Sequence, residues 1–418
     1  MTQQPRSVLV VGAGAIGLAA AYHLAKRGLD VHVLDAGEPG KGASWGNGGW
    51  ISPVLSGPTP GPGIPRVGLT DTFRSDAAVS LRPDRSPSLL LWMAQFARHC
   101  TRPAWERGTR RLAALSQHML ASYGELSRLG IDVSLQQAGN LRACPSPEAA
   151  RQELAALSLM KEYGFDVPDD ILDADRLHAL EPALTEYARA GFLLPSEMHV
   201  DPGVFTSALA EYLRSRGVQI TTGAQVKRLT VRDGRVRQVV TSQGSFETDS
   251  VLVAGGLQSR ELLRPLRIRL PLRGGKGYSF FVATEQAPRR PMYLSTTKVG
   301  VTPLEGGYRV VGGLEFGAED LSINQSMVDA MIAVTRRYVT WPAHTPPQQV
   351  WAGLRPMTPD GLPIMDRIPD VTNTYVSTGH GMLGVGYAMT CGDLMADFIA
   401  ESRKRPVLDP MSLVRFGS

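Results

Sequence analysis

The sequence predicts an α/β protein, in which a mainly parallel sheet is joined to a second domain of antiparallel strands. One observation is an order of strand, glycine-rich turn, helix and strand over residues 8–34, which is typical of a parallel sheet. Another is a series of short strands separated by glycine turns over residues 273–317, which indicates β-hairpins. The length of 418 residues, at about 150 residues per domain, predicts two to three domains.

Composition excludes several classes of protein. Hydrophobic residues make up 43% of the chain and charged residues 20%, which excludes a disordered chain. Basic residues exceed acidic ones by only 44 to 39, so the net charge of +5 does not indicate nucleic-acid binding. The charge mildly favours anionic small substrates or an anionic membrane surface. No stretch reaches the about 18 consecutive apolar residues that a membrane-spanning helix needs without glycines or charges interrupting it.

The cysteines and the N-terminus predict a location. Cys100, Cys144 and Cys391 are odd in number and far apart, which argues against a disulfide framework and against a metal site. We therefore expect no metal and a cytoplasmic protein, with at most peripheral contact with the inner face of the membrane. The apolar segment 7–25 could be read as a signal peptide, but the spacing of its glycines has another explanation.

That explanation is a dinucleotide-binding motif. The β-branched strand 8–11 runs directly into Gly12-Ala13-Gly14-Ala15-Ile16-Gly17, and an alanine-rich helix follows. The next strand ends in Asp35, 21 residues after Gly14. This is the G-x-G-x-x-G pattern of a Rossmann-like fold in its full context. Gly12 permits the tight turn, Gly14 lets the backbone reach a pyrophosphate, and Gly17 lets the helix pack closely on the strand.

The helix and the acid complete the predicted site. The N-terminus of the helix offers free N–H groups and a positive dipole end to phosphates. The carboxylate of Asp35 can accept hydrogen bonds from a ribose hydroxyl. The alternative is a structural glycine-rich turn. The strand, the helix and the acid at the expected spacing favour the dinucleotide.

The residues after Asp35 favour FAD over a nicotinamide cofactor. Residues 37–52 form a second glycine-rich turn, where a nicotinamide-binding domain normally continues into a helix. The segment from Ser44 to Ser52 resembles the S-x-x-N-x-G-x-I-S turn of the D-amino-acid oxidase/dehydrogenase superfamily of FAD enzymes. It is most similar to the bacterial D-amino-acid dehydrogenase branch (small-subunit type), and glycine oxidase and sarcosine oxidase are relatives. The resemblance implies FAD contacts from Ala36, Gly42, Ala43, Ser44, Asn47, Gly48 and Gly49.

The resemblance also implies a discontinuous FAD-binding domain. Residues 1–80, 196–265 and 350–418 would form this domain, and residues 81–195 and 266–349 would form the antiparallel substrate domain. In the family, Val226 would contact the adenine through its backbone, and Ala254 and Gly255 would pass close to the cofactor. From the residues alone, Val226 is equally well an ordinary core residue.

Two further segments allow two interpretations each. Residues 53–65 contain five prolines among glycines, which excludes a helix or a central strand there. This segment is either a passive surface loop or a cover over the active-site entrance. Residues 88–129 are predicted to be helical, and their basic stretch is either a solvated face or a membrane-surface contact. We favour the solvated face, with a core-facing apolar stripe of Leu89, Leu90, Trp92, Met93 and Phe96.

The substrate residues are expected in two C-terminal motifs. Residues 351–361 resemble the family signature G-L-R-P-x-T-x-D-G, which implies that Arg355 binds the substrate carboxylate. A planar guanidinium can form two parallel hydrogen bonds to a carboxylate; the alternative is a surface salt bridge. Residues 375–386 read as a strand, a turn and a helix N-terminus, which the resemblance places against the flavin through Gly381, Met382, Leu383 and Gly384.

Two more side chains are candidates for the substrate site. His380 could donate or accept a hydrogen bond near the reacting centre, or it could be a turn histidine bonded to backbone. Tyr278, in Gly277-Tyr278-Ser279, could shape the pocket or bond the carboxylate or amine of the substrate. A cross-strand packing role is at least as good for Tyr278. Neither residue is expected to be a catalytic base.

The resemblance implies oxidation of the Cα–N bond of an amino acid, by hydride transfer from Cα to flavin N5. The imine would hydrolyse to a 2-oxo acid, and the electrons would pass to a quinone, a redox partner or oxygen. A D-amino acid, which could be D-proline-like, is the expected substrate, and no general base is demanded. The sarcosine oxidase branch has a flavin-linking cysteine where this chain has Gly353, so we expect non-covalent FAD.

Three alternatives stay open at this point. The protein could be an oxidase that uses oxygen, like glycine oxidase. It could be a flavin-bearing binding subunit without amine oxidation. It could also be a nicotinamide dehydrogenase, which would be colourless when purified. The sequence leaves open the side chain and chirality of the substrate, and the oligomeric state of the protein.

Overall fold

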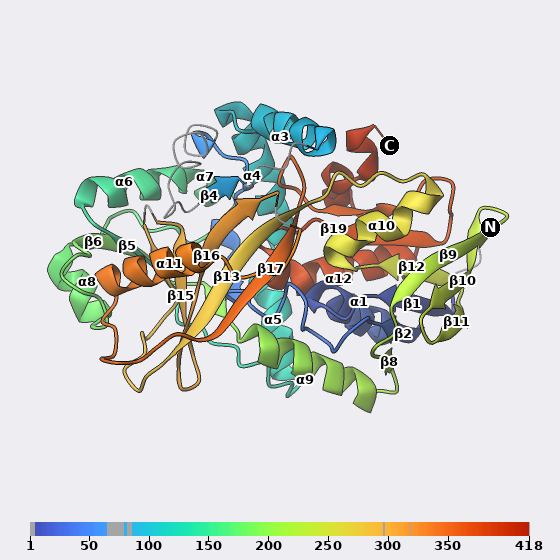
Figure 1. Cartoon of the computed structure of the whole chain (residues 1–418), viewed down its shortest axis with the longest axis horizontal. Helices are drawn as coiled ribbons and strands as arrows, with labels where there is room; N and C mark the ends of the chain where they lie inside the picture. Colours follow the sequence, from blue (N-terminus) through green and yellow to red (C-terminus); the bar gives the residue numbers. More distant parts are fainter. Residues whose placement is uncertain (1–4, 65–78, 82–85, 296, 318, 418) are drawn as a thin grey trace.

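The structure is a computed structural model that describes residues 5–64, 79–81, 86–295, 297–317 and 319–417. Two large sheets lie next to one another along the long axis of the molecule (Figure 1). The first sheet has six strands in the order β18-β19-β12-β1-β2-β8 and is parallel except for the antiparallel pair β18–β19. Its strands are β1 (Ser7–Val11), β2 (Asp30–Leu34), β8 (Gln219–Thr221), β12 (Ser250–Val253), β18 (Ile364–Arg367) and β19 (Thr374–Thr378).

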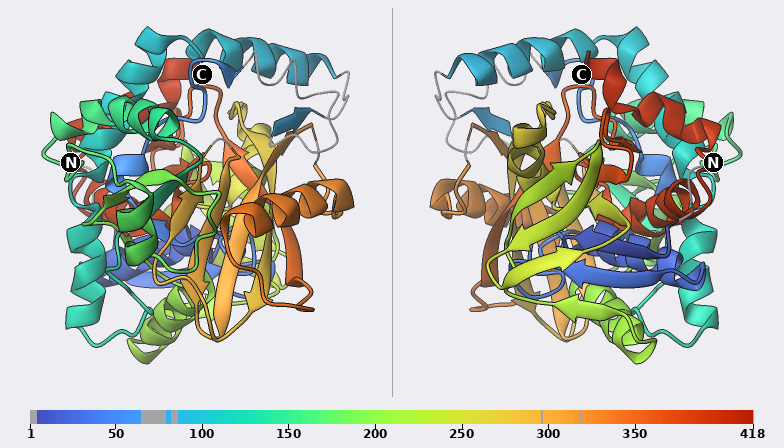
Figure 2. Two further views of the ribbon diagram at one scale, coloured as in Figure 1. Left: turned by 90° about the vertical axis from the view of Figure 1, so that its left-hand side faces the viewer. Right: turned by 90° about the vertical axis from the view of Figure 1, so that its right-hand side faces the viewer.

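Both faces of the first sheet are buried, which explains the continuous apolar sequence of β1. Val8 and Val10 point into one hydrophobic core, and Leu9 and Val11 point into another. Three helices cover the first face, namely α1 (Ala15–Lys26), α9 (Pro202–Ser215) and α12 (Gly384–Ala400). On the opposite face lie α10 (Ser259–Leu263) and the small sheet of β9 (Val226–Arg232), β10 (Arg235–Thr241) and β11 (Gly244–Glu247), as the right-hand view of Figure 2 shows.

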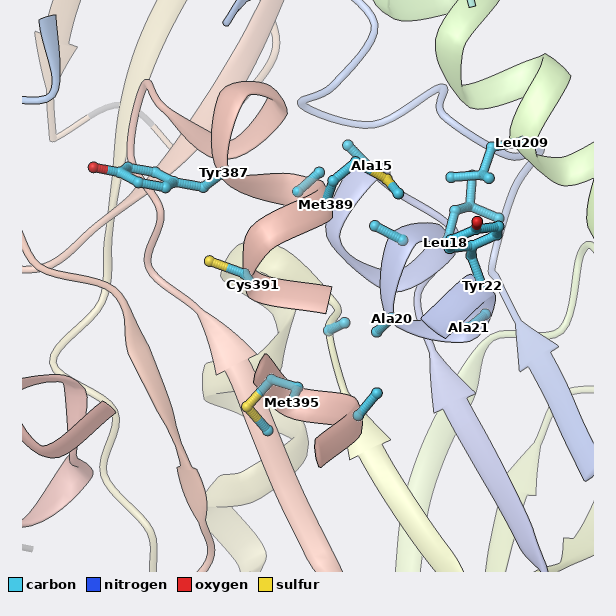
Figure 3. Close-up of a cluster of buried hydrophobic side chains, with 14 of the residues drawn as sticks. Ala15, Leu18, Ala20, Ala21, Tyr22, Leu209, Tyr387, Met389, Cys391 and Met395 are labelled. Carbon is cyan, nitrogen blue, oxygen red and sulfur yellow. The ribbon is translucent and has the colours of Figure 1, made fainter. Parts of the chain in front are cut away.

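Helices α1 and α12 pack unusually closely, although they come from the two ends of the chain. Figure 3 shows the two helices side by side, with Met389 of α12 next to Ala15 of α1 and Leu209 of α9 next to Leu18. The contact depends on small residues. A Cβ atom added at Gly392 of α12 would lie 2.6 Å from the carbonyl carbon of Ala19 in α1. The N-terminal and C-terminal segments of the chain are held together here.

We expect the Gly392→Ala variant to lose about 1–3 kcal/mol of stability, because the added methyl group forces α1 and α12 apart. Unfolding monitored by circular dichroism would measure the change. Gly124→Ala in α5 (Met119–Arg128) is the matched control, since a Cβ at Gly124 meets no atom within 4 Å. An equal loss in both variants would show that helix packing is not the cause.

The second sheet has eight strands and is mainly antiparallel. Seven follow the order β17-β13-β16-β15-β14-β5-β6, and β4 pairs with β16. The pairs β14–β5 and β16–β4 are parallel. The strands are β4 (Val79–Leu81), β5 (Asn140–Cys144), β6 (Ala190–Leu194), β13 (Arg273–Ala283), β14 (Met292–Leu294), β15 (Val299–Leu304), β16 (Gly307–Phe316) and β17 (Gln348–Met357).

The two faces of this second sheet have different neighbours. The outer face packs on α11 (Gln325–Tyr338) and α8 (Ala174–Leu180) through one hydrophobic core (Figure 2, left). The inner face meets the glycine-rich segment after β2 and the two-stranded ribbon of β3 (Trp50–Ile51) and β7 (Met198–His199). The inner face is therefore the part of this sheet that adjoins the first sheet.

Further helices surround these sheets. They are α3 (Pro87–His99), α4 (Arg102–Ser116), α6 (Pro147–Ala156) and α7 (Ser158–Lys161), with short 3-10 helices at Pro53–Leu55, Gly256–Gln258, Arg264–Leu266, Pro406–Met411 and Leu413–Phe416. No helix among the described residues is both long and apolar enough to cross a lipid bilayer.

The mixed α/β fold that the sequence predicts is confirmed. Asp201 caps α9 by accepting a hydrogen bond from Gly203 N at 2.7 Å. The hairpin turn between β9 and β10 has positive φ at both Asp233 (+52°) and Gly234 (+66°), as a tight hairpin requires. Antiparallel strands cover residues 273–317. The domain boundaries at residues 80, 195, 265 and 349 stay a prediction.

Two predictions need correction. The proline-rich segment does contain a helical turn, the 3-10 helix Pro53–Leu55, because proline suits the first position of a helix. Pro53 and Val54 are buried, so the beginning of this segment is not a surface loop; Pro65 lies outside the described residues. Residues 88–129 form three helices, and their apolar stripe is incomplete because Leu90 is 62% exposed. The packed residues are Leu89, Trp92 and Phe96.

Candidate cofactor and substrate site

The first glycine-rich turn has the geometry that its motif predicts. Gly12 has a φ of +109°, and a Cβ atom there would lie 2.6 Å from the carbonyl oxygen of Ala254. A Cβ atom at Gly17 would overlap the carbonyl oxygen of Gly12. Side chains are therefore excluded where the turn crosses to α1 and approaches the end of β12. Ala254 and Gly255 directly follow β12, which brings them next to this turn.

The N-terminus of α1 is arranged to receive an anion. Gly14 is the N-cap residue and has no side chain to satisfy the first amides. The first intrahelical bond runs from Leu18 N to Gly14 O at 3.0 Å, so the preceding amides lack an intrahelical acceptor. Ser44, from the second glycine-rich turn, accepts from Ala15 N at 3.1 Å. The two turns thus meet at a helix end that favours phosphate.

Asp35 lies at the carboxyl end of β2 beside the first turn. One carboxylate oxygen accepts from Ala13 N at 2.6 Å, and the other accepts from Gly37 N at 2.8 Å. Each oxygen keeps a further lone pair for a ligand hydroxyl. Ala224 N donates to Asp35 O at 2.8 Å, which places the start of β9, with Val226, close to this carboxylate. The ribose contact of Asp35 and the adenine contact of Val226 stay predictions.

The second glycine-rich turn joins the C-terminal turn. Asn47 Nδ2 donates to Met382 O at 3.1 Å, and Asn47 Oδ1 accepts from Gly49 N at 2.8 Å. Gly381 and Gly379 have φ values of +55° and +76°, which suit glycine. Gly384 then begins α12, whose N-cap Leu383 offers no side-chain hydrogen bond. The N-terminus of α12 is therefore a second helix N-terminus that faces the region of the first and second glycine-rich turns.

Two side chains of the inner sheet face hold the second turn in place. Arg309 donates to Trp45 O at 3.1 Å, and Thr302 donates to Gly48 O at 2.8 Å. Burial lowers the pKa of Arg309, with Asp201 at 4.0 Å as a partly compensating charge. Sequence analysis missed both residues. The available signal was a polar side chain within a mainly apolar strand, Thr302 in β15 and Arg309 in β16.

Arg355 lies on the inner face of the sheet, in β17. Gly277 of β13 makes room for it, since a Cβ atom there would overlap the guanidinium. Arg355 donates to Gly313 O at 2.7 Å and to Gly312 O at 3.4 Å. Burial lowers the pKa of this guanidinium to about 10. No acidic side chain among the described residues forms an ion pair with this half-buried guanidinium.

The structure does not bring Tyr278 to the Arg355 face. Tyr278 alternates with Gly277 along β13, so its ring points to the outer face and packs in the core under α11. Its hydroxyl donates to Glu315 Oε2 at 3.2 Å. The predicted pocket-shaping role of Tyr278 is therefore not supported by its position, and the packing interpretation fits.

His380 is buried beside the start of α12. Burial lowers its pKa to about 3, so its imidazole is neutral at physiological pH. Its Nε2 atom makes no hydrogen bond with any of the described residues. A neutral histidine can donate or accept one ligand hydrogen bond, which leaves the predicted role open.

Comparison with known proteins decides the family. A family model described as "FAD dependent oxidoreductase" (DAO) matches residues 7–398. The chain belongs to this family of FAD-dependent oxidoreductases. It is 34% identical to a D-amino acid dehydrogenase of Chromohalobacter salexigens over 420 residues, which is 97% of this chain and 98% of that protein.

Solved structures confirm the fold of this oxidoreductase. An L-proline dehydrogenase from P. horikoshii superposes with a TM-score of 0.76 at 17% identity, over 99% of this chain and 98% of that one. A glycine oxidase from Geobacillus kaustophilus superposes with a TM-score of 0.75 at 22% identity, over 99% of both chains. The expected family and the expected mixed fold are thereby confirmed.

The residues present fit FAD. The amides at the start of α1 and Ser44 would hold the pyrophosphate, and Gly14 carries no side chain that would cover these amides. Met382 is 42% exposed beside Asn47, an apolar side chain in a position where a flat apolar ring could cover it. The cofactor of this family therefore has a cradle built from the first turn, the second turn and the C-terminal turn. The contacts of the remaining predicted residues, Ala36, Gly42, Ala43 and Leu383, stay predictions.

Proposed function

We propose that the chain is an FAD-dependent dehydrogenase that oxidises the Cα–N bond of a D-amino acid. The observation that carries the proposal is the half-buried guanidinium of Arg355, whose hydrogen-bond partners among the described residues are the backbone carbonyls of Gly312 and Gly313. The next residue, Pro356, accepts a hydrogen bond from Gly381 N of the C-terminal turn, which brings this part of β17 to the cofactor turns. A carboxylate ligand would supply the missing charge and two parallel hydrogen bonds. The 34% identical D-amino acid dehydrogenase supports the D configuration.

Orientation is the main contribution of the protein to this chemistry. FAD, when bound, supplies the hydride acceptor. Arg355 fixes the carboxylate, so rotation about the carboxylate axis is restricted and one face of Cα is presented. The register partners Gly277 and Gly353 of β13 and β17 make room for two side chains, since a Cβ atom at Gly277 would overlap the Arg355 guanidinium and one at Gly353 would overlap the Trp351 ring. The substrate amine must be neutral, so that its lone pair assists the loss of hydride.

We propose non-covalent attachment of FAD and an acceptor other than oxygen. The cysteines Cys100, Cys144 and Cys391 are all buried, and Gly353 stands at the position where a flavin-linking cysteine occurs in sarcosine oxidases. A quinone at the membrane surface is the acceptor that we propose, with the chain in peripheral contact. Acid precipitation would release a non-covalent flavin into the supernatant.

The test is anaerobic mixing of the purified yellow protein with a panel of amino acids. We expect D-amino acids, and not their L-enantiomers, to bleach the visible flavin absorbance and to yield the 2-oxo acid. No bleaching by any amino acid would support a non-catalytic flavin subunit and overturn the proposal. Comparing peroxide formation in air with dye or quinone reduction then separates an oxidase from a dehydrogenase.

A further inference from the structure

The indole ring of Trp351 and the guanidinium of Arg355 lie on the same face of the second sheet. Trp351, Gly353 and Arg355 follow one another at every second position of β17, so they point to the inner face together. A Cβ atom added at Gly353 would overlap the Trp351 ring, and one added at Gly277 would overlap the Arg355 guanidinium. The ring therefore covers one of these glycines, and the guanidinium covers the other.

No side chain at these two glycine positions separates the indole from the guanidinium. Gly277 and Gly353 are register partners in β13 and β17. The Cβ positions of such partners lie about 5 Å apart, and here both positions are empty of side chain. A ligand whose carboxylate is bound by Arg355 would therefore have the Trp351 ring as a neighbour along the sheet.

The Trp351 ring also meets the second glycine-rich turn. A Cβ atom at Gly46 would overlap the ring, and a Cβ atom at Gly48 would lie 3.3 Å from Val311 Cγ2. Trp351 and Val311 are both register partners of Ser279, on the two sides of β13. The second turn thus crosses the inner face of the sheet, and Trp351 lies where this turn meets the strand that carries Arg355.

The surface that Trp351 adds beside Arg355 is aromatic and accessible, since the residue is only partly buried. Within the described residues, β13, β16 and β17 place no carboxylate on this face: their one acidic residue, Glu315, accepts a hydrogen bond from Tyr278 on the outer face. A cationic side chain of a ligand would find no counter-charge on these strands. An apolar side chain could cover the exposed part of the indole.

We propose that Trp351 determines which substrates the protein accepts, by packing against an apolar side chain of the D-amino acid whose carboxylate Arg355 binds. The inference rests on the proposed function, and it narrows the substrate class to D-amino acids with uncharged, apolar side chains. Trp351 selects these substrates through the apolar surface that the side chain and the ring bury together. If the ring only held the second turn in place, its loss would affect all substrates alike.

Acetate and phenylacetate separate these two roles, because they differ by one benzyl-type phenyl group and neither has an amine to oxidise. Each is titrated into the oxidised holoprotein, and the visible flavin spectrum reports binding. In the wild type, phenylacetate should bind about 10- to 100-fold more tightly than acetate, as burial of a phenyl group predicts. Trp351→Ala should remove most of this difference and leave the affinity for acetate unchanged, whereas Arg355→Met should weaken both ligands.

Anaerobic flavin reduction provides a second comparison. D-Norleucine and D-lysine share the same four side-chain carbons, and D-lysine adds a terminal ammonium. The wild type should therefore use D-norleucine at least about 10-fold more efficiently, as measured by kcat/KM. Trp351→Ala should lower kcat/KM for D-phenylalanine about 10- to 100-fold and leave that for D-alanine nearly unchanged. Trp351→Phe, which keeps an aromatic face, should recover most of the loss.

Trp341→Ala is the matched control. Trp341 packs on Phe280 and Tyr308 in the core on the outer face of the same sheet, with ring centroids 6.2 Å and 6.4 Å apart. Its indole N–H donates to Thr345 O at 3.0 Å. We expect this variant to lose stability while its ratio of phenylacetate to acetate affinity stays that of the wild type.

The outcomes that overturn the inference do not depend on one variant. A wild type that binds the two carboxylates equally tightly overturns it even if Trp351→Ala fails to fold. An equal loss of affinity for both carboxylates in Trp351→Ala or Trp351→Phe also overturns it, because the ring would then only support the turn. A wild type whose flavin no amino acid reduces overturns the proposed function instead, and the carboxylate titrations distinguish the two failures because they need no turnover.

Discussion

Replacing Arg355 with methionine is expected to remove most amino-acid turnover while leaving FAD bound. The guanidinium can form two charge-assisted hydrogen bonds with the substrate carboxylate, each worth about 1.5–3 kcal/mol. Their loss predicts a decrease in kcat/KM of about 10²- to 10⁴-fold. Steady-state and anaerobic stopped-flow kinetics with D-amino acids would measure it, and the visible spectrum would report the bound flavin.

Two further variants sharpen this prediction. Arg355→Lys keeps a positive charge but loses the planar fork, so its activity should fall between those of the wild type and Arg355→Met. Arg367→Met is the control, because Arg367 is an exposed arginine on β18. If Arg355→Met loses its flavin instead of its substrate affinity, the guanidinium supports the fold and not the substrate.

The first cofactor turn could be predicted because all of its determinants are local. Gly12, Gly14 and Gly17 lie within one strand, turn and helix, so their spacing alone defines the close approaches that the structure shows. Asp35 follows β2, which pairs in parallel with β1 and so belongs to the same local unit. Few residues of the chain separate these features, so they can be placed without knowing which strands far apart in the sequence pair with one another.

The roles of the residues that the sequence could not identify depend on contacts between segments far apart in the chain. Arg309 donates to the backbone of Trp45, which is 264 residues away in the chain. Nothing near either residue reveals that the two will meet. The same applies to Thr302, which donates to the backbone of Gly48, 254 residues away in the chain.

Tyr278 shows how sensitive such predictions are to strand parity. Residues Gly277 and Tyr278 are adjacent, yet they point to opposite faces of β13. Only the first of them faces Arg355. Because side chains alternate with a period of two, a motif can be located correctly while the functional residue within it is placed on the wrong face.

A large effect on stability is expected at Asp397 in α12. Its side chain is 1% exposed and accepts hydrogen bonds from Arg27, the C-cap residue of α1. The guanidinium of Arg403 forms an ion pair with the Asp397 carboxylate at 3.1 Å. Arg405 also forms an ion pair with it. We expect Asp397→Asn to lose about 3 kcal/mol at pH 7, since it leaves these guanidiniums without a buried counter-charge. Urea unfolding of the holoprotein would measure the change.

The pH dependence distinguishes this electrostatic cause from a packing defect. Burial alone would raise the pKa of Asp397, but the hydrogen bonds and charges of Arg27 and Arg405 outweigh it and lower that pKa. A carboxyl with a lowered folded-state pKa stabilises the fold fully above its unfolded pKa of about 3.9, and the contribution disappears as the pH falls through the folded value. The difference in unfolding free energy between the wild type and Asp397→Asn should therefore be largest at neutral pH and should decrease in acid.

Asp393→Asn is the matched control. Asp393 pairs with the same Arg27, but its side chain is 35% exposed, so this variant should lose less than about 1 kcal/mol of stability. Equal losses at both positions, or a gap that persists unchanged in acid, would contradict the assignment of this stabilisation to the buried carboxylate.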